Sequence, residues 1–453
     1  MREALRTDLY QLTMMKAYWK SGHKPEATFD YFVRKIPVGS YLVTAGLRYV
    51  LDYIENLHFE DDDIEYLRTQ GFDEEFLDFL GDFKFTGDIL AMPEGSIAFP
   101  LEPIIRVTAP IMEAQLVETY ILNKMNFSTL IATKAVRVVY AARGRAIAEF
   151  GLRRAQGDGH LEATRATYIG GCASTSNVLA GKVFGIPVSG TMAHSFVTSF
   201  EHEIDAFRAY ADTFPSKCFL LIDTYNSIEG AKKAVIVGKE LEQRGEKLQG
   251  VRLDSGDLSE LSKQVRRILD DAGLDYVKIV ASGDLNEWKI DELMRKGARI
   301  DLFGVGTELV TGRPAPALDG IYKLSEVAEH GRHVPKMKLS EETVKATLPG
   351  KKHVWRIVED GGFVKDIISL DDEVVDDAVP LLEPVVKNGK LICNRPSLVQ
   401  IRETVAGNLA KLPDKYKKLE GAPVYPVELS SGLTALRERL VEKIRLEEIG
   451  LKI

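Results

Sequence analysis

Val251-Arg252-Leu253-Asp254-Ser255-Gly256-Asp257 is a short apolar run that ends in charged residues and glycine. Five more runs of this kind lie along the chain, at 145–151, 186–191, 219–224, 279–284 and 300–307. Their polar ends follow one another at intervals of 22 to 40 residues, which is typical of strand–helix–strand units. The intervening segments 228–244 and 258–272 carry apolar residues at three- and four-residue spacing, as amphipathic helices do.

This series predicts an α/β fold. A parallel α/β barrel and a doubly wound sheet both fit, and both place ligands at the C-terminal ends of their strands. We favour an irregular parallel α/β barrel, because the units run consecutively and the first turn has no dinucleotide fingerprint. We expect the barrel at residues 121–340.

The flanking regions predict mixed α+β structure. In residues 1–120 we expect an N-terminal α+β domain, and in 341–453 a C-terminal α+β region that packs on the other two. The expected elements are helices at 8–21, 42–56, 61–70 and 433–449, a strand at 27–32, and a hairpin at 385–392 with an Asn-Gly turn.

Composition limits the classes of protein. The 453 residues are 45% hydrophobic and carry a formal net charge of −8, which argues against a nucleic-acid binder. There is no long apolar run and no signal-peptide pattern, so no membrane association is expected. Three widely spaced cysteines fit a reducing compartment, and we expect a cytoplasmic protein.

Basic residues are concentrated between Lys134 and Arg165. This stretch holds seven basic residues against three acidic ones. Such a local excess in an acidic protein suits a small anionic ligand. A basic helix face without a ligand explains it equally well, so both interpretations stay open.

Four strand ends carry candidate chemistry. Residues 252–257 offer a guanidinium and two carboxylates, which suit a phosphorylated polyol. Residues 282–284 and 304–307 are glycine-containing turns whose N–H groups could hold a phosphate. The apolar run 183–188 predicts a strand that delivers the imidazole of His194 to the same edge. Imidazole suits proton or phosphoryl transfer near neutral pH.

Six motifs, in order, resemble the nicotinate phosphoribosyltransferases, a type II phosphoribosyltransferase family. The motifs cover most of the chain from residue 7 to about 325. They are Thr7-Asp8-Leu9-Tyr10-Gln11-Leu12-Thr13-Met14, Glu149-Phe150-Gly151-Leu152-Arg153-Arg154, Thr175-Ser176-Asn177-Val178-Leu179-Ala180-Gly181, Gly190-Thr191-Met192-Ala193-His194-Ser195, Arg252-Leu253-Asp254-Ser255-Gly256-Asp257 and Gly304-Val305-Gly306-Thr307.

The resemblance implies an ATP-coupled, ligase-type glycosyl transfer in NAD salvage. Nicotinate and phosphoribosyl diphosphate would give nicotinate mononucleotide and diphosphate, and ATP would phosphorylate His194. The other implied catalytic residues are Asp223, which orients His194, Arg252 and Asp254. Mg²⁺ would bind through the diphosphate rather than through protein side chains alone, ATP would be a co-substrate, and no tightly bound organic cofactor is expected.

The resemblance also implies a homodimer with shared active sites. In such a dimer, Tyr10 of one chain and Phe150 of the other would sandwich the pyridine. The implied nicotinate-binding residues are Tyr10, Phe150, Arg153 and Thr191. Arg153 would pair with the nicotinate carboxylate, and Arg154 could take this role instead. The implied phosphoribosyl- and phosphate-binding residues are Arg252, Asp254, Asp257, Ser282, Gly283, Gly304, Gly306 and Thr307.

Each assignment has a structural alternative. Tyr10 and Phe150 could be core aromatics, Arg153 could pair with Glu149, and Asp254 or Asp257 could cap the next helix.

Other activities also remain open. A quinolinate-specific enzyme would share the barrel but lack a phosphorylated histidine, so the segment around His194 argues against it. A sugar-phosphate lyase would need a lysine or a trio of metal ligands at the strand ends. A silent nucleotide sensor would not need His194, Arg252, Asp254 and Asp257 together. A nicotinamide-specific relative would carry an acidic residue near Asn177, where none is present.

Overall fold

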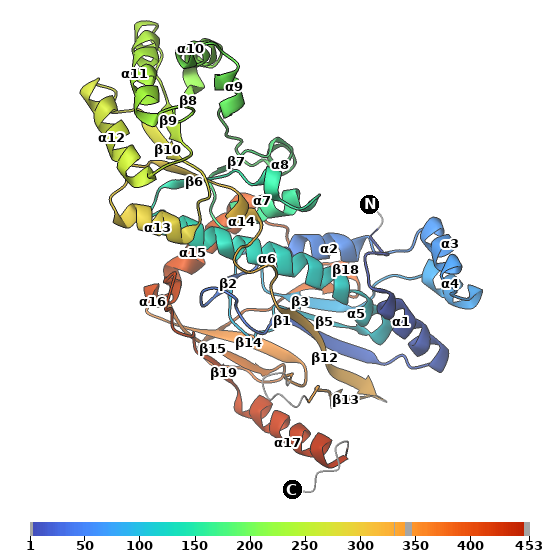
Figure 1. The fold of residues 1–453 in the computed structure, drawn as a ribbon. Helices are drawn as coiled ribbons and strands as arrows, with labels where there is room; N and C mark the ends of the chain where they lie inside the picture. Colours follow the sequence, from blue (N-terminus) through green and yellow to red (C-terminus); the bar gives the residue numbers. More distant parts are fainter. Residues whose placement is uncertain (1–2, 330, 340–346, 448–453) are drawn as a thin grey trace. The chain divides into compact units, whose positions relative to one another are not determined.

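The computed structural model describes residues 3–329, 331–339 and 347–447 (Figure 1). The chain forms two compact units. One is discontinuous and comprises Met1–Leu130 and Ala317–Ile453, and the other is Ile131–Pro316. The sequence placed boundaries near residues 120 and 340, whereas contacts divide the chain after Leu130 and after Pro316.

The central unit contains a six-stranded, all-parallel sheet in the order β7-β6-β11-β10-β9-β8. The predicted parallel α/β fold is therefore confirmed, in the form of a half-barrel. The inner strands are almost wholly buried, as parallel strands covered on both faces must be. The strands are β6 Ala146–Glu149, β7 Ser174–Thr175, β8 Phe219–Leu221, β9 Gly250–Leu253, β10 Lys278–Ala281 and β11 Leu302–Val305.

Three consecutive helices of this unit begin in the same way. Asn226, Asp257 and Asn286 each precede a helix, and each side chain accepts hydrogen bonds from backbone N–H groups of the first turn. Such caps satisfy helix donors that have no partner within the helix. The strand–loop–cap–helix pattern repeats after β8, β9 and β10, at α11 Ser227–Gln243, α12 Leu258–Asp271 and α13 Glu287–Arg295.

This unit also contains further helical segments, including the end of α6. They are α6 Glu118–Ala141, within which the division between the units falls, η1 Leu152–Arg154, α7 Gly159–Ile169, α8 Val178–Phe184, α9 His194–Thr198, α10 Glu203–Thr213, η2 Pro215–Lys217 and α14 Thr307–Val310.

The strand predicted before His194 is wrong. Residues 178–184 form α8, whose first turn is capped by Asn177, and the helix ends at Gly185 in the left-handed region (φ 69°). Of the expected strand, only Val188 pairs, in an isolated bridge to Thr175. The strand of this region is instead the two-residue β7, and His194 is the first residue of α9.

The discontinuous unit is built on a seven-stranded antiparallel sheet in the order β13-β12-β1-β5-β3-β17-β18, beside a four-stranded sheet β16-β14-β15-β19 and the pair β2-β4. The strands are β1 Glu26–Val33, β2 Leu42–Val43, β3 Asp88–Ala91, β4 Ile97–Ala98, β5 Ile105–Pro110, β12 Gly320–Glu329, β13 Arg332–Pro335, β14 Lys352–Glu359, β15 Gly362–Leu370, β16 Ala378–Pro380, β17 Glu383–Lys387, β18 Lys390–Leu391 and β19 Val427–Leu429.

The predicted helices of this unit are found with changed bounds. The helix expected from residue 42 begins at Leu47, because Leu42 and Val43 pair with β4 and Gly46 takes a φ of 103°. The expected hairpin is β17–β18. The last residues of the helix predicted at 433–449 lie outside the described residues. The helices are α1 Leu9–Ser21, α2 Leu47–Glu55, α3 Asp61–Thr69, α4 Glu74–Gly81, α5 Ile111–Leu116, α15 Leu398–Lys411, α16 Asp414–Lys417 and α17 Ser431–Glu447.

Much of the basic cluster predicted at 134–165 is structural. Lys134 and Arg137 are 4% and 3% exposed and both form ion pairs with the fully buried carboxylate of Glu287. Arg143 forms an ion pair with Asp291, and Arg145 donates to backbone carbonyls. These four cations therefore do not serve a small anionic ligand.

The buried cluster around Glu287 gives a stability prediction. We expect Glu287→Gln to lower the free energy of unfolding by about 3–5 kcal/mol, because it leaves two buried cations uncompensated. The matched control is Glu292→Gln, which breaks an exposed pair with Lys296 and should cost less than about 1 kcal/mol. Denaturant unfolding of both variants measures the difference, and equal losses would contradict the buried-pair account.

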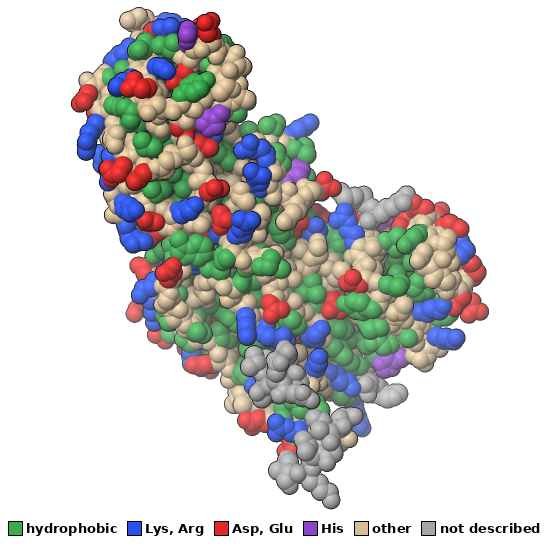
Figure 2. Space-filling view, viewed as in Figure 1, with side chains coloured by type: hydrophobic (Ala, Val, Ile, Leu, Met, Phe, Trp, Pro, Cys, Tyr) green, Lys and Arg blue, Asp and Glu red, His purple; other side chains and the backbone are tan. Residues whose placement is uncertain are grey.

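The surface mixes both signs of charge. On the face shown in Figure 2, Lys and Arg side chains are interspersed with Asp and Glu. Within the described residues, no helix has the length and apolar character needed to cross a membrane.

Candidate functional site

Arg252 lies at the centre of a hydrogen-bonded cluster at the C-terminal ends of β9 and β10. Its Nε donates to Ser282 Oγ at 3.0 Å, and its Nη2 donates to Asp254 Oδ1 at 3.2 Å. Its Nη1 donates to Thr191 Oγ1 at 2.8 Å and to the Met192 carbonyl at 3.2 Å. The structure therefore brings together four residues that the sequence singled out, from three separate segments.

The turn after β10 fits closely against the loop after β9. Ser282 is buried and its hydroxyl also donates to Asp254 Oδ1. Gly283 adopts a φ of 93°, and a Cβ at this position would lie 2.0 Å from the carbonyl oxygen of Asp254. Only glycine accommodates both the left-handed backbone and this approach. The glycine thus allows the turn after β10 to pack directly against the backbone of Asp254.

His194 lies beside the end of β8. Its Nδ1 shares a 3.1 Å hydrogen bond with Thr224 Oγ1, and its Nε2 lies 4.0 Å from Asp223 Oδ1. The imidazole is 43% exposed, whereas the Asp223 side chain is 1% exposed. One nitrogen is therefore held by a hydroxyl, and the other faces a buried carboxylate.

Asp223 connects this histidine to the loop after β9. Its Oδ2 accepts hydrogen bonds from the Asp254 N–H at 2.9 Å and from Ser255 Oγ at 2.7 Å. Its Oδ1, which faces the imidazole, receives no hydrogen bond from the part of the chain that is described. A buried carboxylate oxygen without a donor is costly, so Oδ1 is available to a donor at His194.

Phe150 follows β6 and its ring packs against Gly304 of β11. A Cβ at Gly304 would lie 2.5 Å from both Cδ2 and Cε2 of the ring. Phe150 is only partly buried, so the glycine holds an aromatic ring at the strand ends rather than in the core. Phe150 is therefore not a fully buried core aromatic, which was the alternative that the sequence allowed.

Glu149 and Asn177 belong to one buried network. Glu149 accepts hydrogen bonds from the Gly151 N–H and from the hydroxyls of Thr164 and Thr175. Thr164 Oγ1 also accepts from the Asn177 amide at 3.2 Å. The sequence argument about Asn177 missed this buried carboxylate, which lies one hydroxyl away from the amide.

The other predicted site residues take varied positions. Asp257 caps α12 by accepting hydrogen bonds from the N–H groups of Ser259 and Glu260. This is the helix-capping role that the sequence offered as the alternative to phosphate binding. Gly306 and Thr307 follow β11 and begin α14.

The predicted nicotinate-binding cations are exposed. Arg153 and Arg154 lie in η1 with no buried residue around them in that turn. Glu149 receives its hydrogen bonds from other groups, so the alternative pairing of Arg153 with Glu149 is absent. Tyr10 is 47% exposed on α1, in the other unit. These side chains are free to meet a ligand.

Sequence reasoning missed Thr224 and Ser255. Both residues directly follow a residue that the sequence did single out, Asp223 and Asp254. A hydroxyl next to a strand-end carboxylate was the available signal. Among the described residues, no group of three or more His, Cys, Asp or Glu side chains is arranged to hold a metal ion.

The fold and this cluster define a class of protein. A parallel α/β half-barrel whose strand ends gather a guanidinium, carboxylates and hydroxyls is suited to a polyhydroxylated, phosphorylated ligand. The chain matches the nicotinate phosphoribosyltransferase N-terminal domain over residues 5–126, the family's central region over 146–340, and its C-terminal domain over 375–437. It belongs to the nicotinate phosphoribosyltransferase family.

Individual relatives match this chain in sequence along nearly their whole length. The chain is 43% identical to a nicotinate phosphoribosyltransferase of Mycobacterium tuberculosis over 96% of this chain and 94% of the relative. It is 40% identical to that of Bacillus subtilis, with 98% and 97% covered. The crystal structure of human nicotinic acid phosphoribosyltransferase superposes with a TM-score of 0.85 at 31% identity, covering 96% of this chain and 99% of the human one.

Proposed function

We propose that this chain transfers the phosphoribosyl group of phosphoribosyl diphosphate to nicotinate, forming nicotinate mononucleotide and diphosphate for NAD salvage. The observation that carries the proposal is the Arg252 cluster at the strand ends, in a chain of this family. The glycosidic C–O bond to diphosphate breaks and the bond from ribose C1 to the pyridine nitrogen forms. The protein's task is therefore positioning and charge stabilisation.

In this proposal the strand-end residues hold the phosphoribosyl group. Arg252 faces the developing negative charge, and Asp254 accepts hydrogen bonds from ribose hydroxyls. The turns that contain Ser282, Gly283, Gly306 and Thr307 surround the phosphate, with Asp257 stabilising the first turn of α12 nearby. Gly304 lies in β11 and serves this site indirectly, by its contact with Phe150. Mg²⁺ bound to the diphosphate would face the carboxylate of Asp254 and would supply charge neutralisation.

We assign nicotinate recognition to the end of β6, which neighbours β11 in the sheet. The ring of Phe150, held in place by Gly304, provides one stacking surface. Arg153 is exposed and pairs with the carboxylate of nicotinate, with Arg154 beside it, and Thr191 completes the site. A cationic pair at this position favours the anionic nicotinate over nicotinamide.

We further propose that ATP phosphorylates His194. The imidazole nitrogen attacks the γ-phosphorus, a P–N bond forms, the bond to the β-phosphate oxygen breaks and ADP leaves. Water later cleaves the P–N bond and releases phosphate. The half-exposed ring, held by Thr224 and facing Asp223, supports this role.

The position of Asp223 supports coupling between the two reactions. A phosphoryl group on His194 adds negative charge near the Asp223 carboxylate. That carboxylate holds the Asp254 N–H and the Ser255 hydroxyl, so the added charge acts on the loop that binds the phosphoribosyl group. ATP cleavage can in this way alter substrate affinity.

Incubation with γ-labelled ATP, followed by phosphoribosyl diphosphate with nicotinate or nicotinamide, tests these assignments. We expect an acid-labile, base-stable label on the wild-type chain that His194→Ala abolishes. His202→Ala, at an exposed histidine of the same unit, is the matched control and should retain the label. Mononucleotide should form from nicotinate and not from nicotinamide.

The outcomes separate the two parts of the proposal. Label that persists in His194→Ala contradicts the phosphohistidine but leaves the transfer reaction standing. Equal use of nicotinamide and nicotinate contradicts the substrate assignment, whatever the label shows.

We propose a homodimer in which Tyr10 of one subunit faces Phe150 of the other across the pyridine. Leu9 and Tyr10 are 62% and 47% exposed at the start of α1, which suits a surface that meets a second chain.

Mixing two inactive variants tests this arrangement. Tyr10→Ala and Phe150→Ala homodimers should each lose about 10²-fold in kcat/KM, because stacking is lost on one face. After mixing and subunit exchange, about a quarter of the wild-type activity should return, because half the dimers are mixed and each restores one of two sites. Mixtures no more active than their components would exclude shared sites.

We place the protein in the cytoplasm. Its three cysteines are all free, and Cys172 and Cys218 are buried. Burial raises the pKa of the Cys218 thiol to about 12, so this group stays protonated and unreactive near neutral pH.

A further inference from the structure

A cavity of about 280 Å³ lies within the discontinuous unit, between the seven-stranded and four-stranded sheets. Its walls are largely apolar and include Phe32 of β1, Leu101, and Leu429 of β19. Leu101 takes a φ of 72°, an unfavourable conformation for a side chain of this size. It keeps 40% of its surface exposed at the cavity wall. None of these residues belongs to the proposed reaction site.

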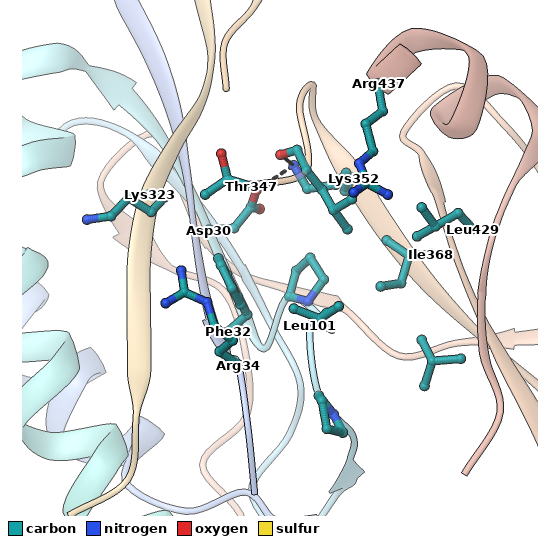
Figure 3. Close-up of a pocket in the computed structure, with 14 residues that line it drawn as sticks. Asp30, Phe32, Arg34, Leu101, Lys323, Thr347, Lys352, Ile368, Leu429 and Arg437 are labelled. Carbon is teal, nitrogen blue, oxygen red and sulfur yellow. Dashed lines mark hydrogen bonds and ion pairs between the residues drawn. The ribbon is translucent and has the colours of Figure 1, made fainter. Parts of the chain in front are cut away.

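The floor of the cavity is a buried ion pair. Lys352 Nζ lies 2.8 Å from Asp30 Oδ2, and both side chains are 3% exposed (Figure 3). The ammonium also donates to the carbonyls of Leu348 and Gly350, so the backbone holds it beside Asp30. Asp30 Oδ1 is buried, and no donor among the described residues reaches it.

Two guanidinium groups line the cavity, and neither forms an ion pair with another described residue. In the described part of the chain, no carboxylate lies within ion-pair distance of Arg34 or Arg437. Figure 3 shows Arg437 extending from α17 toward the cavity, whereas the ammonium of Lys323 points away from it, toward Glu118 at 4.0 Å. Because Asp30 and Lys352 neutralise each other, the remaining charge on the described residues that line the cavity is positive.

We propose that this cavity binds a small organic acid with an apolar body and one hydroxyl or N–H donor. Arg437 pairs with the acid group, and Arg34 adds to the positive field. The apolar walls cover the body of the ligand, and its donor satisfies Asp30 Oδ1. The cavity would thus be a second ligand site, and its chemistry does not depend on the proposed reaction.

Titration calorimetry of the full chain with 4-hydroxyphenylacetate tests the proposal. Saturating nicotinate is present throughout to block the reaction site. Without it, 4-hydroxyphenylacetate could bind there, because it is an aromatic acid as nicotinate is. We expect saturable binding with a Kd below roughly 1 mM. Phenylacetate, which lacks the donor, and 4-hydroxyphenylacetamide, which lacks the charge, should each bind about tenfold or more weakly.

Variants locate the binding. Arg437→Glu should weaken binding of 4-hydroxyphenylacetate by about tenfold or more, and Arg34→Gln should weaken it by a smaller factor. Arg439→Glu is the matched control, because it makes the same charge change at an exposed position of α17 outside the cavity. Its affinity should equal that of the wild type, and thermal unfolding checks that each variant is folded.

Several results would overturn the proposal. They are the absence of saturable binding to the wild-type chain, equal affinities for the acid and its amide, and equal losses in Arg437→Glu and Arg439→Glu. If Arg437→Glu does not fold, an Arg34→Gln variant that binds as tightly as the wild type overturns the proposal independently.

Discussion

Arg252→Ala is expected to lower kcat/KM for phosphoribosyl diphosphate by about 10³-fold, equivalent to ~4 kcal/mol. The guanidinium connects Ser282, Asp254 and Thr191. Its removal therefore loses the positive charge and also releases the side chains that it positions. Arg252→Lys should recover only part of the loss, because an ammonium cannot make the same planar set of hydrogen bonds.

Steady-state kinetics with varied phosphoribosyl diphosphate measures this effect. The matched control is Arg267→Ala on α12, at an exposed arginine of the same unit, which should leave kcat/KM unchanged. A loss of less than tenfold in Arg252→Ala would show that the cluster does not hold the reacting group.

Gly283→Ala is expected to destabilise the central unit by about 3 kcal/mol and to reduce activity with it. A left-handed residue costs about 1 kcal/mol when alanine replaces glycine, and overlap with packed atoms adds about 1–3 kcal/mol. Here the overlapped atom is the Asp254 carbonyl oxygen, 2.0 Å from the new Cβ. Relief of this clash must move the loop after β9.

Gly297→Ala separates the two causes. Gly297 also has a left-handed backbone, with a φ of 71°, but a Cβ there meets no atom within 4 Å. It should therefore lose about 1 kcal/mol and keep full activity. If both variants lose the same free energy of unfolding in denaturant, close packing of the two loops is not what requires glycine at 283.

Strand ends were the predictable part of this protein. Arg252, Asp254 and Ser282 were placed together because parallel neighbouring strands end at one edge of a sheet, and the structure brings them within hydrogen-bonding distance. The helices at 228–244 and 258–272 were also predictable, because amphipathic spacing is a local signal, and the structure has them as α11 and α12.

The segment before His194 was not predictable in this way. The predicted strand rests on the apolar run 183–188, and a short apolar run is consistent with either a strand or a helix. The cap from Asn177 is a local signal, but the bridge of Val188 to Thr175 and the close approach of Gly181 to Val188 depend on tertiary packing. The two-residue β7 is polar and too short to give a periodic signal.

The contacts of Asp223 could not be predicted from the sequence either. Its neighbours Thr224 and Ser255 come from different loops, and hydroxyl groups at loop positions are common without any function. Only the fold shows that one carboxylate oxygen holds the loop after β9 while the other faces an imidazole.

The interleaved order of the two units has a consequence for synthesis of the chain. β1 pairs with β12, and Glu26 meets Ala328, so the ribosome must translate the whole central unit before β1 gains that neighbour. At roughly 5–20 residues per second, this delay is on the order of 15–60 s. The contiguous central unit can fold meanwhile, but β1 waits with one edge unpaired. Nascent chains paused within residues 131–316 should therefore be the ones that depend most on chaperones.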